Sequence, residues 1–180
     1  ILHTLQRTEK GRCTMIERTI REYRENVFDA IGSQWMLITA GNDEKINTMT
    51  ASWGGMGVLW KRNVATVYVR PQRYTKQFID ASDHFSLCFF DESWRRQLAY
   101  LGSVSGRDEP KIETAGLTVV SERAAPYFAQ ASLVMICRKL YAQPMEESCF
   151  LDPTVLNECY PLRDLHTMYI GEITQLLTQE

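Results

Sequence analysis

The sequence predicts a mainly β fold with short helices (α+β), arranged as a closed or partly closed antiparallel barrel. At least six segments have the length and residue types of strands. The helical segments between them are short, and they do not follow the regular strand and helix alternation of a doubly wound sheet. A length of 180 residues is that of one domain with a substantial core. We therefore expect a single domain over residues 15–180.

Strands are expected where β-branched and aromatic residues alternate, or where short apolar runs are bounded by turn residues. Residues 41–44 supply the turn chemistry that makes a hairpin of the first two strands. Pro71 ends the third strand because proline cannot donate to a ladder. The expected strands cover residues 35–40, 46–51, 64–70, 85–90, 117–120, 132–142 and 165–177.

Helices are expected where apolar residues recur at helical spacing next to start or stop residues. Thr75 is expected to cap one of them with its hydroxyl, with Phe78 and Ile79 facing inward. The expected helices are residues 15–24, a single turn at 26–31 stopped by Gly32, one that begins at Thr75, one from Asp91 to Gly102, and a short one at 110–115.

The composition is that of a globular protein and argues against two classes of partner. A formal net charge of −2 provides no general positive field for a phosphate backbone, so we expect no nucleic acid partner. No apolar run has the length that spans a bilayer, so we expect no membrane partner.

The cysteines and the N-terminal residues bear on the compartment. The five cysteines form no C-x-x-C pair, and Cys88 and Cys137 lie in apolar strand-like runs, which favours a reduced, cytoplasmic protein. Residues 1–14 lack the layout of a secretion signal. We expect them to be a disordered or upstream extension, with Met15 as the natural start.

The first candidate segment for a ligand site runs from Asn47 to Gly57. Small and hydroxylated residues leave an expected strand and enter a glycine-rich loop, which would let backbone amides and hydroxyls approach a planar ligand closely. The alternative is an ordinary irregular loop with a buried tryptophan. The residues alone leave both interpretations open.

The second candidate segment places Arg70, Arg73, Tyr74 and Thr75 at a strand-to-helix junction. Guanidinium groups and the free amides of a helix N-terminus both bind anions, so the segment is a candidate phosphate site. The alternative is a solvated turn whose arginines pair with surface acids.

Two further candidates are weaker on their own. Ser105, Gly106 and Arg107 either line the rim of a pocket or form a plain turn. The imidazole of His166 either donates a hydrogen bond to a ligand or manages a proton, or it is a hydrogen-bonded structural histidine. The other histidines are not spaced with it, or with the cysteines, as metal ligands, so we expect no metal site.

Four segments, taken in order, resemble the flavin reductase-like, FMN-binding split-barrel family, with the closest likeness to its flavoredoxin branch. The likeness covers the chain from Met15 onward, and it implies a split β-barrel, a homodimer, and FMN held near the subunit interface. The segments are Asn47–Trp53, Arg70–Thr75, Ser105–Asp108 and His166–Glu172.

The resemblance also implies a place for each matching residue. Many family members carry Asp-Lys where this chain has Glu109 and Pro110 before Lys111, which leaves the role of Lys111 undetermined. The expected places are the isoalloxazine ring and ribityl chain of FMN for Thr50, Ala51, Ser52 and Trp53, its phosphate for Arg70, Arg73, Tyr74 and Thr75, the closing edge of the site for Ser105, Gly106 and Arg107, and the nicotinamide for His166.

The activity that the resemblance implies is an NAD(P)H-dependent flavin reductase, in which a hydride passes from NADH or NADPH to flavin. One alternative is a flavoredoxin-like electron carrier that keeps FMN tightly bound and serves a redox protein partner. Another is a small β-barrel interaction domain without a cofactor, in which the same segments are turns and core. The sequence does not choose between NADH and NADPH.

Overall fold

A computed structural model describes residues 14–42 and 44–180 of the chain. The extension expected at residues 1–14 lies, apart from Thr14, outside the described residues, and so does Cys13.

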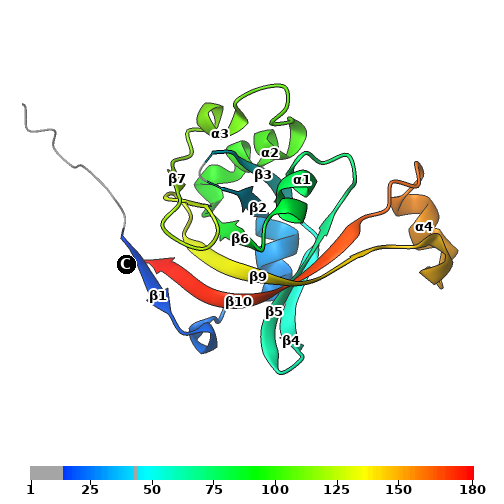
Figure 1. Cartoon of the computed structure of the whole chain (residues 1–180), viewed down its shortest axis with the longest axis horizontal. Helices are drawn as coiled ribbons and strands as arrows, with labels where there is room; N and C mark the ends of the chain where they lie inside the picture. Colours follow the sequence, from blue (N-terminus) through cyan, green and yellow to red (C-terminus); the bar gives the residue numbers. More distant parts are fainter. Residues whose placement is uncertain (1–13, 43) are drawn as a thin grey trace, which may run out of the picture.

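One curled antiparallel sheet forms the body of the described chain (Figure 1). Its strands are β1 (Met15–Arg18), β2 (Met36–Gly41), β3 (Ile46–Ala51), β4 (Gly54–Leu59), β5 (Arg62–Val69), β6 (His84–Phe89), β9 (Leu133–Pro144) and β10 (Thr167–Gln179). Two short strands, β7 (Val119–Val120) and β8 (Tyr127–Phe128), form a separate pair. The strand order is β3-β2-β6-β9-β10-β5-β4, and β1 pairs with β10. The expected mainly β fold with short helices is confirmed.

The two end strands of this path, β3 and β4, follow each other directly in the chain. Only Ser52 and Trp53 separate the last residue of β3 from the first residue of β4. Three consecutive Cα steps span at most about 11 Å. The sheet therefore curls until its two edges come close at Ser52 and Trp53, and the barrel is split at this point.

Short helices cover one side of the sheet. α1 (Thr75–Ala81), α2 (Arg95–Ser103) and α3 (Lys111–Thr114) lie together at the top of Figure 1. α4 (Pro153–Cys159) lies on the connection between β9 and β10, which projects away from the body. Single 3-10 turns at residues 20–22, 92–94 and 147–149 and a π-helix, Asp29–Gln34, complete the helical part.

The core lies on both faces of the sheet because neighbouring strand residues point to opposite sides. Ile38 belongs to the cluster inside the curl, whereas Leu37 packs against α2 and its surroundings. Cys137 and Cys88 divide between the two clusters in the same way. Both thiols are free and fully buried, as expected, and burial raises the pKa of Cys88 to about 11.

The helix expected over residues 15–24 is wrong. Met15–Arg18 instead forms β1, which pairs antiparallel with the end of β10, and a single 3-10 turn follows. The open edge of a 13-residue strand offers backbone partners that a sparse apolar helix face cannot match. The pairing partner lies some 160 residues away, so no local pattern could reveal it.

Two other expectations near the split are also wrong. The turn that Gly32 should stop continues to Gln34, because Arg95 donates to the carbonyls of Ser33 and Gln34 at 2.6 and 3.2 Å. The glycine-rich loop is strand β4, paired along its length with β5. A Cβ at Gly54 would lie 2.9 Å from the carbonyl oxygen of Thr66, so a glycine is needed for this close pairing.

Candidate functional site

Ser52 and Trp53, at the split of the barrel, line a cavity of about 740 Å³. Aromatic side chains from two other parts of the chain form its walls: Tyr68 of β5, and Phe150 and Tyr160 of the connection that carries α4. The size and the apolar lining are those of a site for a planar organic ligand. Trp53 is 44% exposed, so the buried tryptophan of the alternative interpretation is wrong.

His166 lies behind this cavity, next to two of its wall residues. Its ring centroid is 5.1 Å from that of Trp53 and 5.4 Å from that of Tyr160, and the hydroxyl of Tyr160 lies 2.8 Å from His166 Nδ1. Burial lowers the pKa of His166 to about 4, with a smaller contribution from the Arg70 guanidinium, so the imidazole is neutral near pH 7. We call Trp53, Tyr68, Tyr160 and His166 the aromatic–histidine cluster.

Arg70 belongs with this cluster and not with the other residues of its segment. It makes an ion pair of 2.5 Å with Asp164, donates to the carbonyl of Cys159 at 2.9 Å, and lies 5.1 Å from the Tyr160 ring centroid. Asp164 also accepts from Gln72 at 2.6 Å, and these two contacts lower the pKa of its carboxyl group. The alternative interpretation, an arginine paired with an acid, therefore describes Arg70.

Tyr74 and Arg107 bring the second and third candidate segments together. The Arg107 guanidinium lies 4.5 Å from the ring centroid of Tyr74, and Lys45 Nζ lies 5.3 Å from the same centroid. Both cations are exposed. We call Lys45, Tyr74 and Arg107 the Tyr74 cluster. The amide of Arg107 also donates to the hydroxyl of Ser105, which closes the turn at Gly106.

Thr75 and Gly106 meet at Asn47, the first residue of the first segment. Asn47 Nδ2 donates to Thr75 Oγ1 at 2.8 Å, and both residues are buried. A Cβ on Gly106 would lie 2.2 Å from Asn47 Oδ1, so any other residue there would have to displace the Asn47 amide. The expectation that Thr75 caps α1 is wrong: Tyr74 occupies the cap position, and the Thr75 hydroxyl is engaged by Asn47.

The C-terminal end of α2 is held by three side chains. Thr50 donates to the carbonyl of Leu98 at 2.6 Å and Arg73 to that of Gly102 at 2.7 Å. Lys111 Nζ donates to the carbonyls of Leu101 and Val104 at 2.9 and 3.0 Å. These bonds satisfy carbonyl groups that a helix end leaves without partners.

Lys111 is therefore a structural cation inside the fold. It is only 3% exposed, and burial together with the nearby Arg73 lowers its pKa to about 8. Sequence reasoning missed this role because the carbonyls that Lys111 contacts lie across a turn that no local pattern describes. Ala51, in turn, packs into the core, so only its backbone is available to a ligand.

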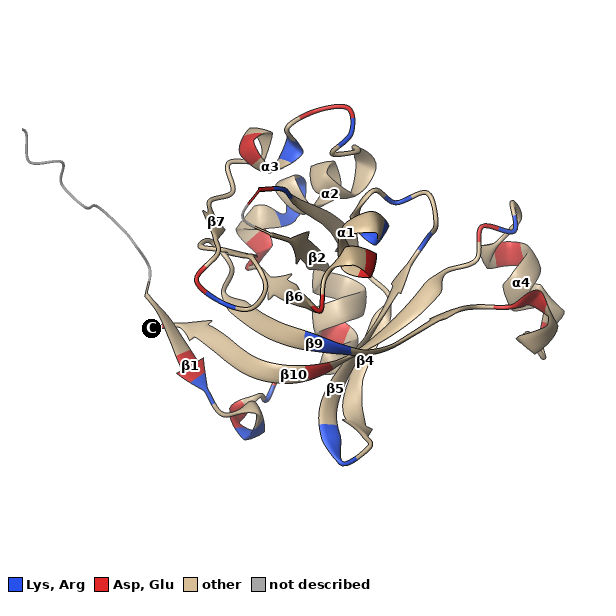
Figure 2. Ribbon diagram, viewed as in Figure 1, with Lys and Arg blue, Asp and Glu red and all other residues tan. Residues whose placement is uncertain are grey.

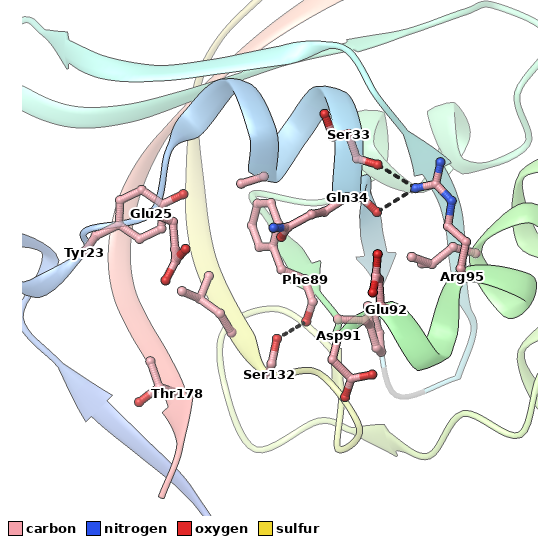
Figure 3. Close-up of a pocket in the computed structure, with 14 residues that line it drawn as sticks. Tyr23, Glu25, Ser33, Gln34, Phe89, Asp91, Glu92, Arg95, Ser132 and Thr178 are labelled. Atoms are coloured by element: carbon pink, nitrogen blue, oxygen red, sulfur yellow. Dashed lines mark hydrogen bonds between the residues drawn. The ribbon is translucent and has the colours of Figure 1, made fainter.

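A second cavity, of about 690 Å³, lies beneath the π-helix (Figure 3). Figure 3 shows Arg95 bonded to Ser33 and Gln34 on one side and Tyr23 with Glu25 on the other. None of the site residues expected from the sequence lines this cavity. The candidate site is therefore the split of the barrel and the Tyr74 cluster.

Charges of both signs are interspersed along the described chain (Figure 2). Within residues 14–42 and 44–180, no three His, Cys, Asp or Glu side chains are grouped as metal ligands. None of the helices in these ranges is long and apolar enough to cross a bilayer.

Comparison with known proteins gives a family. The family model described as "Flavin reductase like domain" matches residues 28–180. No curated protein matches the chain.

Solved structures share the fold. An FMN-binding domain of a flavin reductases-like enzyme from Shewanella baltica has a TM-score of 0.67 at 16% identity, over 94% of this chain and 79% of its own. Flavoredoxin from Methanosarcina acetivorans has a TM-score of 0.63 at 22% identity, over 82% of this chain and 69% of its own. A putative flavin reductase with a split barrel domain from Shewanella frigidimarina has a TM-score of 0.64 at 16% identity, over 84% of this chain and 71% of its own. At these identities the likeness shows the fold, and the expected split barrel is confirmed.

Proposed function

Because the chain belongs to the flavin reductase-like domain family, we propose that it is an FMN-binding oxidoreductase that transfers a hydride from NADH or NADPH to flavin. The observation that carries the proposal is the aromatic-walled cavity of about 740 Å³ at the split of the barrel, with His166 beside it. A cavity of this kind suits a ring system that must lie flat against a second ring.

The described residues fit FMN in the chemistry of both its ends. Trp53, Tyr68 and Tyr160 offer apolar ring surfaces for the isoalloxazine. The two exposed cations of the Tyr74 cluster, Lys45 and Arg107, offer positive charge for the phosphate, and Arg107 also offers forked donors. Bound FMN would supply the electron acceptor that the chain's own side chains lack.

The chain's own residues would then bind, orient and exclude water. The aromatic walls would keep water from the two rings, so that the hydride passes between them without side reactions with solvent. His166 is neutral near pH 7 because of its lowered pKa, so it serves as a hydrogen-bond donor and not as a strong acid. We assign it to the carboxamide of the nicotinamide, which needs a donor for its carbonyl oxygen.

An anaerobic titration of the FMN-loaded protein tests the activity. Addition of NADH or of NADPH should bleach the flavin absorbance band in proportion to the nucleotide added, and free FMN in air should then sustain nucleotide oxidation. A flavin band that neither nucleotide changes would contradict the proposal.

A second candidate function is an electron carrier that keeps FMN bound for a redox protein partner. The exposed apolar residues at the cavity mouth favour it, because Phe28 is 87% exposed and Val155 is 44% exposed. This function predicts FMN that survives dialysis, poor turnover of free flavin, and reduction by a redox protein in place of nicotinamide.

We also propose a homodimer in the cytoplasm. Phe28 and Val155 lie at the cavity mouth, and Leu151, which is 98% exposed, lies on the same projecting connection as α4 (Figure 1). Exposed apolar side chains that gather on one surface mark an interaction site, and a second copy of the chain would cover this one. The free thiols among the described residues support a reducing compartment. Sedimentation should give the mass of two chains, and a Val155→Asp variant should shift the protein toward one.

A further inference from the structure

Tyr160 and His166 stand at the two ends of the short connection that joins α4 to β10. Tyr160 directly follows α4, and His166 directly precedes β10. The connection folds back so that the Tyr160 hydroxyl meets His166 Nδ1 at 2.8 Å. The two side chains are 4% and 7% exposed, so water does not compete for this hydrogen bond.

The Tyr160 ring is itself held in place from three sides. The Arg70 guanidinium lies 5.1 Å from its centroid, and Phe150 and Trp53 contact it edge-on at 5.7 and 6.5 Å. Arg70 is in turn fixed by its ion pair with Asp164. The hydroxyl of Tyr160 is thus a fixed group, and His166 must orient to it.

The hydroxyl has two acceptors within reach, and they differ in strength. One is His166 Nδ1 at 2.8 Å, and the other is the thioether of Met145 at 3.7 Å. A thioether sulfur is a weak acceptor, whereas an unprotonated imidazole nitrogen is a strong one. The hydroxyl hydrogen therefore goes to Nδ1, and the single hydrogen of the neutral imidazole stays on Nε2.

From this geometry we infer that Tyr160 is a positioning residue, which fixes His166 as the Nε2–H tautomer and leaves that N–H free to donate to a ligand beside Trp53. Within residues 14–42 and 44–180, His166 Nε2 makes no hydrogen bond. A donor tautomer suits a carbonyl acceptor such as that of a carboxamide. The identity of that ligand rests on the proposed function. The assignment of the His166 tautomer does not depend on it.

The charged groups that face His166 do not alter this assignment. Arg70 and Arg73 disfavour a second proton on the ring, and Asp164 favours it. The Tyr68 and His166 rings are nearly perpendicular, and their centroids lie 6.5 Å apart. The pKa of His166 remains low in the sum of these influences, so the neutral form prevails at pH 7.

Nitrogen-15 NMR of the histidine rings tests the tautomer in the flavin-free chain at pH 7. We expect wild-type His166 to show a pyrrole-type Nε2 and an imine-type Nδ1, and the Tyr160→Phe variant to show a mixture of tautomers. A hydrogen on Nδ1 in the wild type, or an unchanged spectrum in Tyr160→Phe, would overturn the inference. Tyr141→Phe, which removes a hydroxyl from an exposed ring of β9, is the matched control and should leave the His166 signals in place.

Steady-state kinetics provide the second readout. Loss of one fixed hydrogen bond should raise the KM for the nicotinamide nucleotide about fivefold in Tyr160→Phe, a larger factor than any change in kcat. If wild-type protein oxidises the nucleotide but the variant has the same KM, the inference fails while the proposed function stands. If the wild type oxidises no nucleotide but the NMR result is as expected, the proposed function fails and the tautomer assignment stands.

Discussion

Asn47 Nδ2 donates to Thr75 Oγ1 at 2.8 Å, and this buried bond ties the start of β3 to the first turn of α1. Gly106 packs directly against the same Asn47 side chain. Three segments that lie far apart in the sequence thus meet at one asparagine. Substitutions at this point should therefore disturb the expected phosphate end of the site.

The Gly106→Ala variant tests the packing of Gly106 against Asn47. The new methyl group would overlap Asn47 Oδ1 and push the asparagine away from Thr75. We expect a loss of about 1–3 kcal/mol in the free energy of unfolding, together with weaker FMN binding. Chemical denaturation and FMN titration measure the two effects. Gly57→Ala is the control because no heavy atom lies within 4 Å of its added Cβ. Equal behaviour of the two variants would contradict the packing described.

Arg73→Ala and Thr75→Ala should each weaken FMN binding while the fold remains intact. Arg73→Ala removes the donor to the Gly102 carbonyl, and Thr75→Ala leaves Asn47 without its acceptor. Loss of a hydrogen bond from either side chain to the charged phosphate would lower the affinity for FMN roughly tenfold. Fluorescence titration with FMN measures it, with Thr75→Ser and the exposed Arg96→Ala as controls. Unchanged affinity in both alanine variants would mean that the phosphate binds elsewhere.

Lys111→Met should change how stability depends on alkaline pH. The folded chain lowers the pKa of Lys111 from 10.5 to about 8, so between these values the unfolded chain binds a proton that the folded chain does not. The free energy of unfolding of the wild type therefore gains up to about 3 kcal/mol from this residue as the pH rises through that window. The neutral amine keeps two hydrogens for the carbonyls of Leu101 and Val104.

Urea unfolding of wild type and Lys111→Met at pH 7.5 to 10.5 measures this contribution as a difference. In the difference between the two free energies of unfolding, the contributions of groups that titrate in both proteins cancel. Lys76→Met, at a surface ion pair with Asp80, is the matched control and should follow the wild type. Parallel curves for wild type and Lys111→Met would refute the assignment.

His166 should make the wild type less stable as the pH falls from about 6.5 to about 4. In this range the unfolded chain protonates the imidazole, whereas the folded chain keeps it neutral because it is buried. The loss should amount to on the order of 3 kcal/mol over the whole range, with roughly 2 kcal/mol of it between pH 7 and pH 5, and His166→Gln should lack it. Urea unfolding at pH 7 and pH 5 compares the two proteins, with His84→Gln as control. An equal pH effect in wild type and His166→Gln would show that His166 is not buried in the neutral form.

Local sequence patterns were sufficient to predict a strand where its own residues have the alternation or the apolar character of a strand. The alternation in residues 64–70 and the apolar run at 132–142 predict β5 and β9 closely. They were not sufficient for β1, whose partner β10 lies at the other end of the chain, or for β4, which forms a tight hairpin with β5. Gly54 reads as loop chemistry, but its missing Cβ allows close pairing with β5.

The site was predictable in part for the same reason. The resemblance placed Tyr74 and Arg107 in one site, and the structure brings them together. It grouped Arg70 with them, whereas Asp164 and Tyr160 hold Arg70 in the aromatic–histidine cluster. Tyr160 carried no sequence signal, since a lone tyrosine before a proline indicates nothing until His166 folds back onto it.

The split of the barrel and the Tyr74 cluster should together hold one FMN. Isothermal titration calorimetry of the flavin-free protein with FMN measures this binding. We expect saturable binding with one FMN per chain, and a titration that gives no more than the heat of dilution would contradict this site.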